Sequence, residues 1–141
     1  MALNLVTPED YSAILNLMGT YQHLVDDGDE EGWADLFTED GAFLGVPGDH
    51  APADGFAGRE GLKRIPRLNI AQSGGRFRHN LCSLGARYGA TRDEAFARYY
   101  MLGTISPVGQ GTSVLMEVDV STHLVRIYGQ WKIKSNRMTM L

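Results

Sequence analysis

The sequence predicts a single α+β domain, residues 1–141, in which a curved antiparallel sheet packs its concave face on helices from the first half of the chain. Helix signals dominate up to about residue 68. From Phe77 onward, apolar and polar residues alternate as they do in half-buried strands. The length suffices to bury roughly two thirds of the unfolded surface without disulfides or metal ions. One domain with a small internal pocket is therefore expected.

The first helix is expected from about Pro8 to Val25. Thr7 is a good N-cap, and a proline in the first turn costs no hydrogen bond. Gly28 is expected to end this helix, because glycine readily takes the left-handed backbone conformation. Asp29 is then expected to cap a second, short helix that runs through Trp33 to Phe37.

Helical spacing places Tyr21 near the centre of a broad apolar arc on the first helix. Asp26 projects at the margin of that arc, whereas Asp27 projects outside it. An error of one residue in the helix boundary would exchange the two carboxylates, so Asp27 is kept as the alternative. A phenol and a carboxylate are therefore expected beside an apolar wall, to which Trp33 and Phe43 are assigned as residues that contact a substrate.

The remaining elements are a third helix and a series of strands. The third helix is expected from Gly58 to residue 64 or 68, where Pro66 ends or bends it. The turn-rich segment 47–55 contains His50 and is expected to be a loop over the pocket mouth. The expected strands are 41–46, 76–81, 95–105, 114–120, 124–128 and 131–138.

Composition excludes several classes of function. The net charge of -4 provides no basic surface for phosphate backbones, so nucleic acid is not an expected partner. The chain has one cysteine, Cys82, and shows no secretory signal pattern, so a cytoplasmic location is expected. No apolar run approaches the roughly 20 residues that span a bilayer, and membrane insertion is not expected. No metal-ligand or dinucleotide motif is present, so neither a metal ion nor a cofactor is predicted.

His79 is the main candidate for proton transfer. It shares one face of its predicted strand with Phe77 and Leu81. A histidine side chain gains and loses its proton close to neutral pH, and a carboxylate on one ring nitrogen would orient the ring and stabilise the imidazolium. We assign that carboxylate to Asp26. The competing interpretation is that His79 is a hydrogen-bonded core residue.

Tyr21 is predicted to hold a substrate oxygen that gains charge, since a buried phenol requires a hydrogen-bond partner. Arg137 shares parity with Trp131 and Ile133, which directs its cation into the pocket to bind a substrate anion. His123 is a further pocket candidate, although a bulge between residues 120 and 124 would move it to the other face of its strand.

Three motifs resemble those of a known family, the SnoaL-like group of the nuclear-transport-factor-2-like superfamily, over nearly the whole chain. The first extends from Asp26 to Gly41, the second from Phe56 to Leu62, and the third from Gly129 to Arg137. The resemblance implies a cone-shaped sheet of the cystatin-like type around an apolar cavity. It also implies homo-oligomers, either dimers or trimers.

The chain looks most like the dehydratase-like branch, of the scytalone dehydratase and bile-acid 7α-dehydratase type. In that branch a helix aspartate pairs with a strand histidine, positions that Asp26 and His79 match, and Tyr21 matches a tyrosine that precedes the aspartate. The resemblance implies a cofactor-independent dehydratase or isomerase for a small apolar, aromatic or cyclic substrate bearing hydroxyl or keto groups. The alternative is a non-catalytic binding or assembly subunit, like the β-subunit of ring-hydroxylating dioxygenases.

Overall fold

The computed structural model describes residues 3–46, 52 and 54–141, which form helices followed by a curled sheet. His50 and most of the predicted 47–55 loop lie outside the described residues. The helices and strands are α1 (Pro8–Asp27), α2 (Glu30–Ala34), β1 (Phe37–Leu44), β2 (Phe56–Ala57), α3 (Gly58–Ser73), β3 (Phe77–Tyr88), β4 (Glu94–Ile105), β5 (Ser113–Ile127) and β6 (Gln130–Met140). The predicted α+β class is confirmed.

The ends of α1 follow the sequence signals. The Thr7 side chain accepts a hydrogen bond from the Asp10 N–H, and Gly28 ends the helix with φ 72°. Ile14, Met18, Tyr21 and Val25 are buried on the predicted apolar side. The helix ends two residues later than predicted, so Asp26 lies within its last turn.

The second and third helices differ from the predicted bounds. The helix α2 ends at Ala34, because Phe37 instead pairs with Ile133 and begins β1. Sheet pairing therefore overrides the local helical pattern here. The helix α3 continues through the buried Pro66 to Ser73, where Gly74 ends it with φ 60°. Packing of α3 against α1, α2 and β1 offsets the roughly 3 kcal/mol that an internal proline costs a helix.

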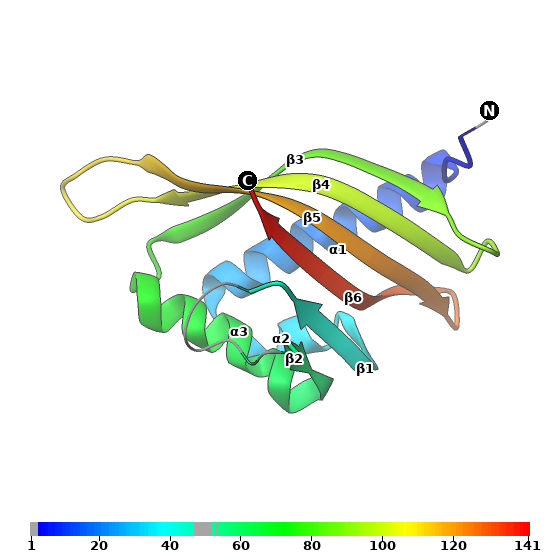
Figure 1. Ribbon diagram of the computed structural model, residues 1–141, viewed down its shortest axis with the longest axis horizontal. Helices are drawn as coiled ribbons and strands as arrows, with labels where there is room; N and C mark the ends of the chain where they lie inside the picture. Colours follow the sequence, from blue (N-terminus) through cyan, green and yellow to red (C-terminus); the bar gives the residue numbers. More distant parts are fainter. Residues whose placement is uncertain (1–2, 47–51, 53) are drawn as a thin grey trace.

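The six strands form one sheet in the order β2-β1-β6-β5-β4-β3. Every pair is antiparallel except β1 with β6, which is parallel, so the sheet is mixed rather than purely antiparallel. The predicted strands 114–120 and 124–128 are one continuous strand, β5. Figure 1 shows α1 lying along one face of the sheet, with α2 and α3 beside β1 and β2.

Two β-bulges change which side chains face the helices. In β3 the pairing shifts between Cys82 and Gly85, where Ser83 has φ 58°. In β6 it shifts between Ile133 and Ser135, because Lys134 is an extra residue. Beyond each bulge the alternation of inward and outward side chains is reversed.

The hydrophobic core lies between α1 and the concave face of the sheet. Trp33, Leu62, Val118, Leu124 and Ile133 are among its fully buried residues. The helices in the described part of the chain include none that is both long and apolar enough to span a membrane.

Candidate active site

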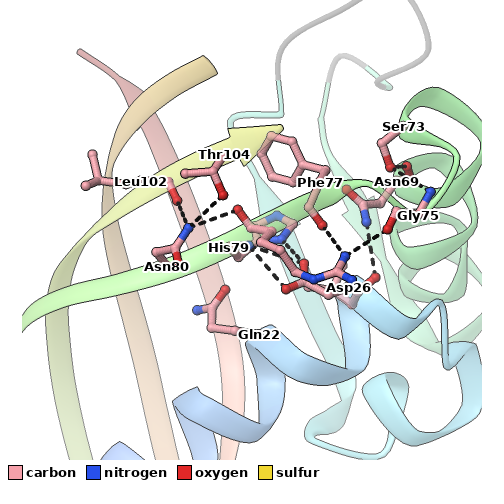
Figure 2. Close-up of polar contacts among 12 residues, drawn as sticks. Gln22, Asp26, Asn69, Ser73, Gly75, Phe77, His79, Asn80, Leu102 and Thr104 are labelled. Carbon is pink, nitrogen blue, oxygen red and sulfur yellow. Dashed lines mark hydrogen bonds and ion pairs between the residues drawn. The ribbon is translucent and has the colours of Figure 1, made fainter. Parts of the chain in front are cut away.

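His79 and Asp26 meet between the start of β3 and the end of α1. The His79 Nδ1 atom lies 2.5 Å from Asp26 Oδ1 (Figure 2). The main-chain N–H of His79 also donates to the same carboxylate, at 3.3 Å from Oδ1 and 3.2 Å from Oδ2. The carboxylate thus holds residue 79 by both its ring and its backbone, which fixes the imidazole orientation.

Burial makes this contact unlike a surface ion pair. The Asp26 side chain is 7% exposed and that of His79 is 17% exposed. Asp27 and His23, its neighbours on α1, are exposed to solvent. The structure therefore places Asp26, not the alternative Asp27, against the histidine. Nδ1 is engaged by the carboxylate, which leaves Nε2 as the nitrogen that can contact a ligand.

The segment between α3 and β3 holds this pair in place. Asn69 donates from its amide to the Val25 carbonyl, 3.2 Å away, and so ties α3 to the last turn of α1. The Ser73 hydroxyl donates to the Asn69 carbonyl and accepts from the Gly75 N–H. Figure 2 shows these contacts beside the His79–Asp26 pair. The two helix ends and the start of β3 thus form one hydrogen-bonded unit.

Tyr21 lies deeper in the core and belongs to a buried polar cluster. Its oxygen accepts a hydrogen bond from Asn136 Nδ2 at 2.9 Å, and Asn136 Oδ1 accepts one from Thr122. Burial raises the pKa of Tyr21 well above its usual value, and the nearby Tyr99 acts in the same direction, whereas the Asn136 hydrogen bond opposes them. The phenol therefore stays protonated at neutral pH and can donate its O–H.

Trp33 and Phe43 lie in the aromatic core that surrounds Tyr21. The ring of Trp33 is 5.2 Å from that of Tyr21 and 5.9 Å from that of Phe43, measured between centroids. All three side chains are buried. The imidazole of His79 has an apolar neighbour of its own, since Phe77 packs edge-on against it at 4.8 Å. Both polar groups therefore adjoin apolar rings.

The predicted orientation of Arg137 is wrong. The bulge at Lys134 reverses the alternation of β6, so Asn136 faces the interior and Arg137 faces outward. Arg137 pairs with Ser121 and Leu44 across neighbouring strands and lines a depression of about 570 Å³ on the outer face of the sheet. Arg137 faces outward because side chains alternate along a strand with a strict period of two, so one extra residue exchanges the two faces.

His123 also lies on the outer face and not in the interior. Its Nε2 atom is 2.9 Å from Glu94 Oε2, and its ring stacks on Phe96 at 4.6 Å. The pKa of Glu94 lies below its usual value. The main cause is the hydrogen bond from the Ala90 backbone N–H, and the hydrogen bond from His123 is the second. His123 lines the same outer depression as Arg137. The structure thus places neither of the two residues with Asp26 and His79.

The sequence analysis missed Asn136, Tyr99 and Gln22, which complete the interior polar cluster. Tyr99 shares its strand face with the buried Ala97 and Met101, and Gln22 stands four residues after Met18 on the buried side of α1, so periodicity alone could have found both. Asn136 had no such signal, because the bulge precedes it. Within residues 3–46, 52 and 54–141, no three histidine, cysteine or acidic side chains group as metal ligands do.

Solved structures with the same fold include several bacterial proteins. Aln2 from a Streptomyces species is 20% identical with a TM-score of 0.84, and the alignment covers 96% of this chain and 94% of that one. A Catenulispora acidiphila protein in complex with S-DNPA is 26% identical with a TM-score of 0.75, covering 95% of both chains.

A further similar structure is a putative scytalone dehydratase from Novosphingobium aromaticivorans. It is 21% identical with a TM-score of 0.74, over 94% of this chain and 84% of that one. No curated protein matches the chain. The family model of the SnoaL-like domain matches residues 7–137, and that family includes polyketide cyclases and dehydratases. The chain therefore belongs to the SnoaL-like domain family.

Proposed function

We propose that the protein is a cofactor-independent lyase, a dehydratase, or an isomerase that acts on a small cyclic substrate with hydroxyl or keto groups. The observation that carries this proposal is the 2.5 Å contact between His79 Nδ1 and the buried Asp26 carboxylate. Such a pair leaves one imidazole nitrogen free to exchange a proton with a ligand. Membership of the SnoaL-like family supports the same reaction class.

The proposed reaction begins with proton removal by His79. Nε2 takes a proton from the carbon next to a substrate carbonyl, and the electron pair moves into the carbonyl to form an enolate. Asp26 accepts the Nδ1–H hydrogen bond and stabilises the imidazolium that results. The enolate then reforms the carbonyl and expels a hydroxyl group, which takes the proton from the imidazolium and leaves as water. Return of that proton to another carbon would give isomerisation instead.

Tyr21 is proposed to donate its phenolic hydrogen to the oxygen that gains charge. Its oxygen already accepts from Asn136, and no acceptor for its own O–H exists among the described residues. The raised pKa keeps that hydrogen in place near neutral pH. A donor held in advance at the site of developing charge costs no reorganisation during the reaction.

The test is a turnover screen with hydroxylated polyketide, steroid and aromatic ketones, followed by absorbance. For a ketone that the parent converts, His79→Ala and Asp26→Asn are expected to lower kcat by about 10²–10⁴-fold, the usual contribution of a positioned acid or base. The matched controls are His23→Ala and Asp27→Asn, which make the same changes at exposed positions of α1. They should keep parental turnover.

Equal turnover in the parent, His79→Ala and Asp26→Asn would refute the proposed pair. Ligand binding without turnover of any ketone would favour the alternative, a non-catalytic binding or assembly subunit. A binding measurement on the same set of ketones by calorimetry separates that outcome from a protein that binds none of them.

A further inference from the structure

The buried polar cluster contains an amide, that of Gln22, whose oxygen makes no hydrogen bond to the described residues. Gln22 on α1 is 5% exposed, and its Nε2 atom donates to the Tyr99 hydroxyl at 3.2 Å. Its Oε1 atom is fully buried, and no hydrogen-bond partner for it exists within residues 3–46, 52 and 54–141. Buried polar atoms are normally paired, so an unpaired amide oxygen in an interior requires an explanation.

Gln22 lies on the same helix as the carboxylate of the proposed proton-transfer pair. It lies one helical turn before Asp26, so both side chains project from the same side of α1. Figure 2 shows Gln22 extending toward the sheet beside the His79–Asp26 pair. The unpaired oxygen therefore belongs to the same stretch of helix as the carboxylate that holds His79.

The neighbouring tyrosines supply the opposite kind of group. The Tyr21 and Tyr99 oxygens each accept a hydrogen bond from an amide, so each phenol keeps its own O–H to donate. Among the described residues neither O–H has an acceptor. Burial raises the pKa of Tyr99, as it does for Tyr21, so both remain donors at neutral pH. The cluster therefore offers two donors and one acceptor to a ligand.

We propose that Gln22 determines substrate specificity by accepting a hydrogen bond from a hydroxyl group of the ligand through Oε1. The tyrosine hydroxyls complement a carbonyl oxygen of the same molecule. The substrate class is thus a hydroxylated cyclic ketone, in which the carbonyl oxygen accepts and the hydroxyl donates. This inference rests on the proposed function, because it assumes that the ligand of the His79–Asp26 pair also reaches Gln22.

The test uses ligands that differ by one donor. The probes are 5-, 6- and 7-hydroxy-1-tetralone, each compared with its own methyl ether, and their Kd values are measured by isothermal titration calorimetry. At least one hydroxytetralone is expected to bind the parent about 10-fold more tightly than its ether, as one hydrogen bond to a buried acceptor provides. In Gln22→Met, which keeps the side-chain length, this preference is expected to disappear.

Two further variants test whether the acceptor oxygen itself causes the preference for the hydroxytetralone. Gln22→Glu keeps an acceptor and is expected to keep the preference. Gln72→Met makes the same change as Gln22→Met at an exposed position of α3 and should behave as the parent. The Tm of Gln22→Met reports two opposing effects, because the substitution removes an unpaired buried oxygen and also the hydrogen bond that Nε2 donates to Tyr99.

Two results would overturn the proposal. One is a parent that does not distinguish any hydroxytetralone from its ether, including a parent that binds none of them. The other is a preference that persists in Gln22→Met, which would leave Gln22 as a structural partner of Tyr99 only. The outcome is independent of turnover. Loss of the preference in a protein without activity would retain the specificity role while the proposed reaction fails.

Discussion

Asp26 acts on residue 79 through two different atoms, the ring nitrogen and the main-chain nitrogen. The two contacts have different consequences for substitution. His79→Ala removes the ring contact but keeps the backbone N–H that holds the carboxylate. Asp26→Asn weakens both contacts, because an amide oxygen is a poorer acceptor than a carboxylate. Asp26 is therefore the residue of the pair on which local order depends most.

The outward Arg137 and the inward Asn136 give a stability prediction. Asn136 is 1% exposed and bonds both Tyr21 and Thr122, so Asn136→Leu leaves two buried hydroxyl groups without a partner. The free energy of unfolding should fall by about 2–3 kcal/mol. The same substitution at the adjacent, exposed residue, Arg137→Leu, should alter the free energy of unfolding by no more than about 0.5 kcal/mol. Urea denaturation measures both, and equal losses would contradict the observed bulge.

Residue-level prediction from the sequence succeeded where an element is regular. The helical period placed Asp26 at the margin of the apolar arc of α1, where the structure finds it buried, and the strand period placed His79 with Phe77 and Leu81, because no bulge lies between these residues. Arg137 was misplaced by one extra residue, Lys134. A single insertion leaves no mark on the hydrophobic pattern, so the inward Asn136 was not predictable.

At the level of elements, the position of the site depends on how α1 ends. Gly28 has φ 72°, and a Cβ there would lie 2.7 Å from Ile70 Cγ1 on α3. The close approach brings the last turn of α1 against α3, where Asn69 bonds the Val25 carbonyl. Glycine at this point therefore both ends the helix and permits the contact that positions Asp26.

Two glycines allow these contributions to be separated. Gly28 and Gly74 both have positive φ, but a Cβ at Gly74 would meet nothing within 4 Å. Gly74→Ala should lower the free energy of unfolding by about 1 kcal/mol, the cost of the left-handed backbone. Gly28→Ala should cost at least about 1 kcal/mol more, because it also overpacks against Ile70. Thermal and urea unfolding measure both free energies of unfolding. Similar decreases in the two variants would show that α3 moves to accept the added Cβ without cost.

Element boundaries were harder to predict than element types. The helical pattern through Phe37 was overridden by pairing with Ile133 in β6, a contact between residues far apart in the sequence. The predicted strands 114–120 and 124–128 leave a gap between them, yet β5 passes through it as one long strand. Long-range pairing supplies the information that local patterns lack.

At the scale of the whole molecule, the two buried tyrosines make stability depend on alkaline pH. Their folded pKa values lie above the usual value of 10.0, mainly through burial. Below about pH 10 both are protonated in the folded and unfolded chains, and stability does not depend on them. Above it, only the unfolded chain releases the protons.

The free energy of unfolding should therefore fall as pH rises above about 10, by on the order of 1 kcal/mol per pH unit for each tyrosine. Tyr21→Phe and Tyr99→Phe should each reduce that slope by one tyrosine's share. Tyr128 is fully exposed, so Tyr128→Phe should leave the slope unchanged. Urea denaturation between pH 9 and pH 11 measures the slopes, and identical slopes in all four proteins would contradict the burial of these phenols.

The strand order has a consequence for biosynthesis. The strand β6 comes last in the sequence, yet it lies between β1 and β5 in the sheet. A nascent chain that has reached residue 129 can pair β3, β4 and β5, whereas β1 still lacks the strand that joins it to them. Until then one edge of β5 and one edge of β1 lack a pairing partner, and unpaired strand edges favour non-native association. Closure of the sheet therefore waits for β6, the strand through which β1 becomes joined to β5.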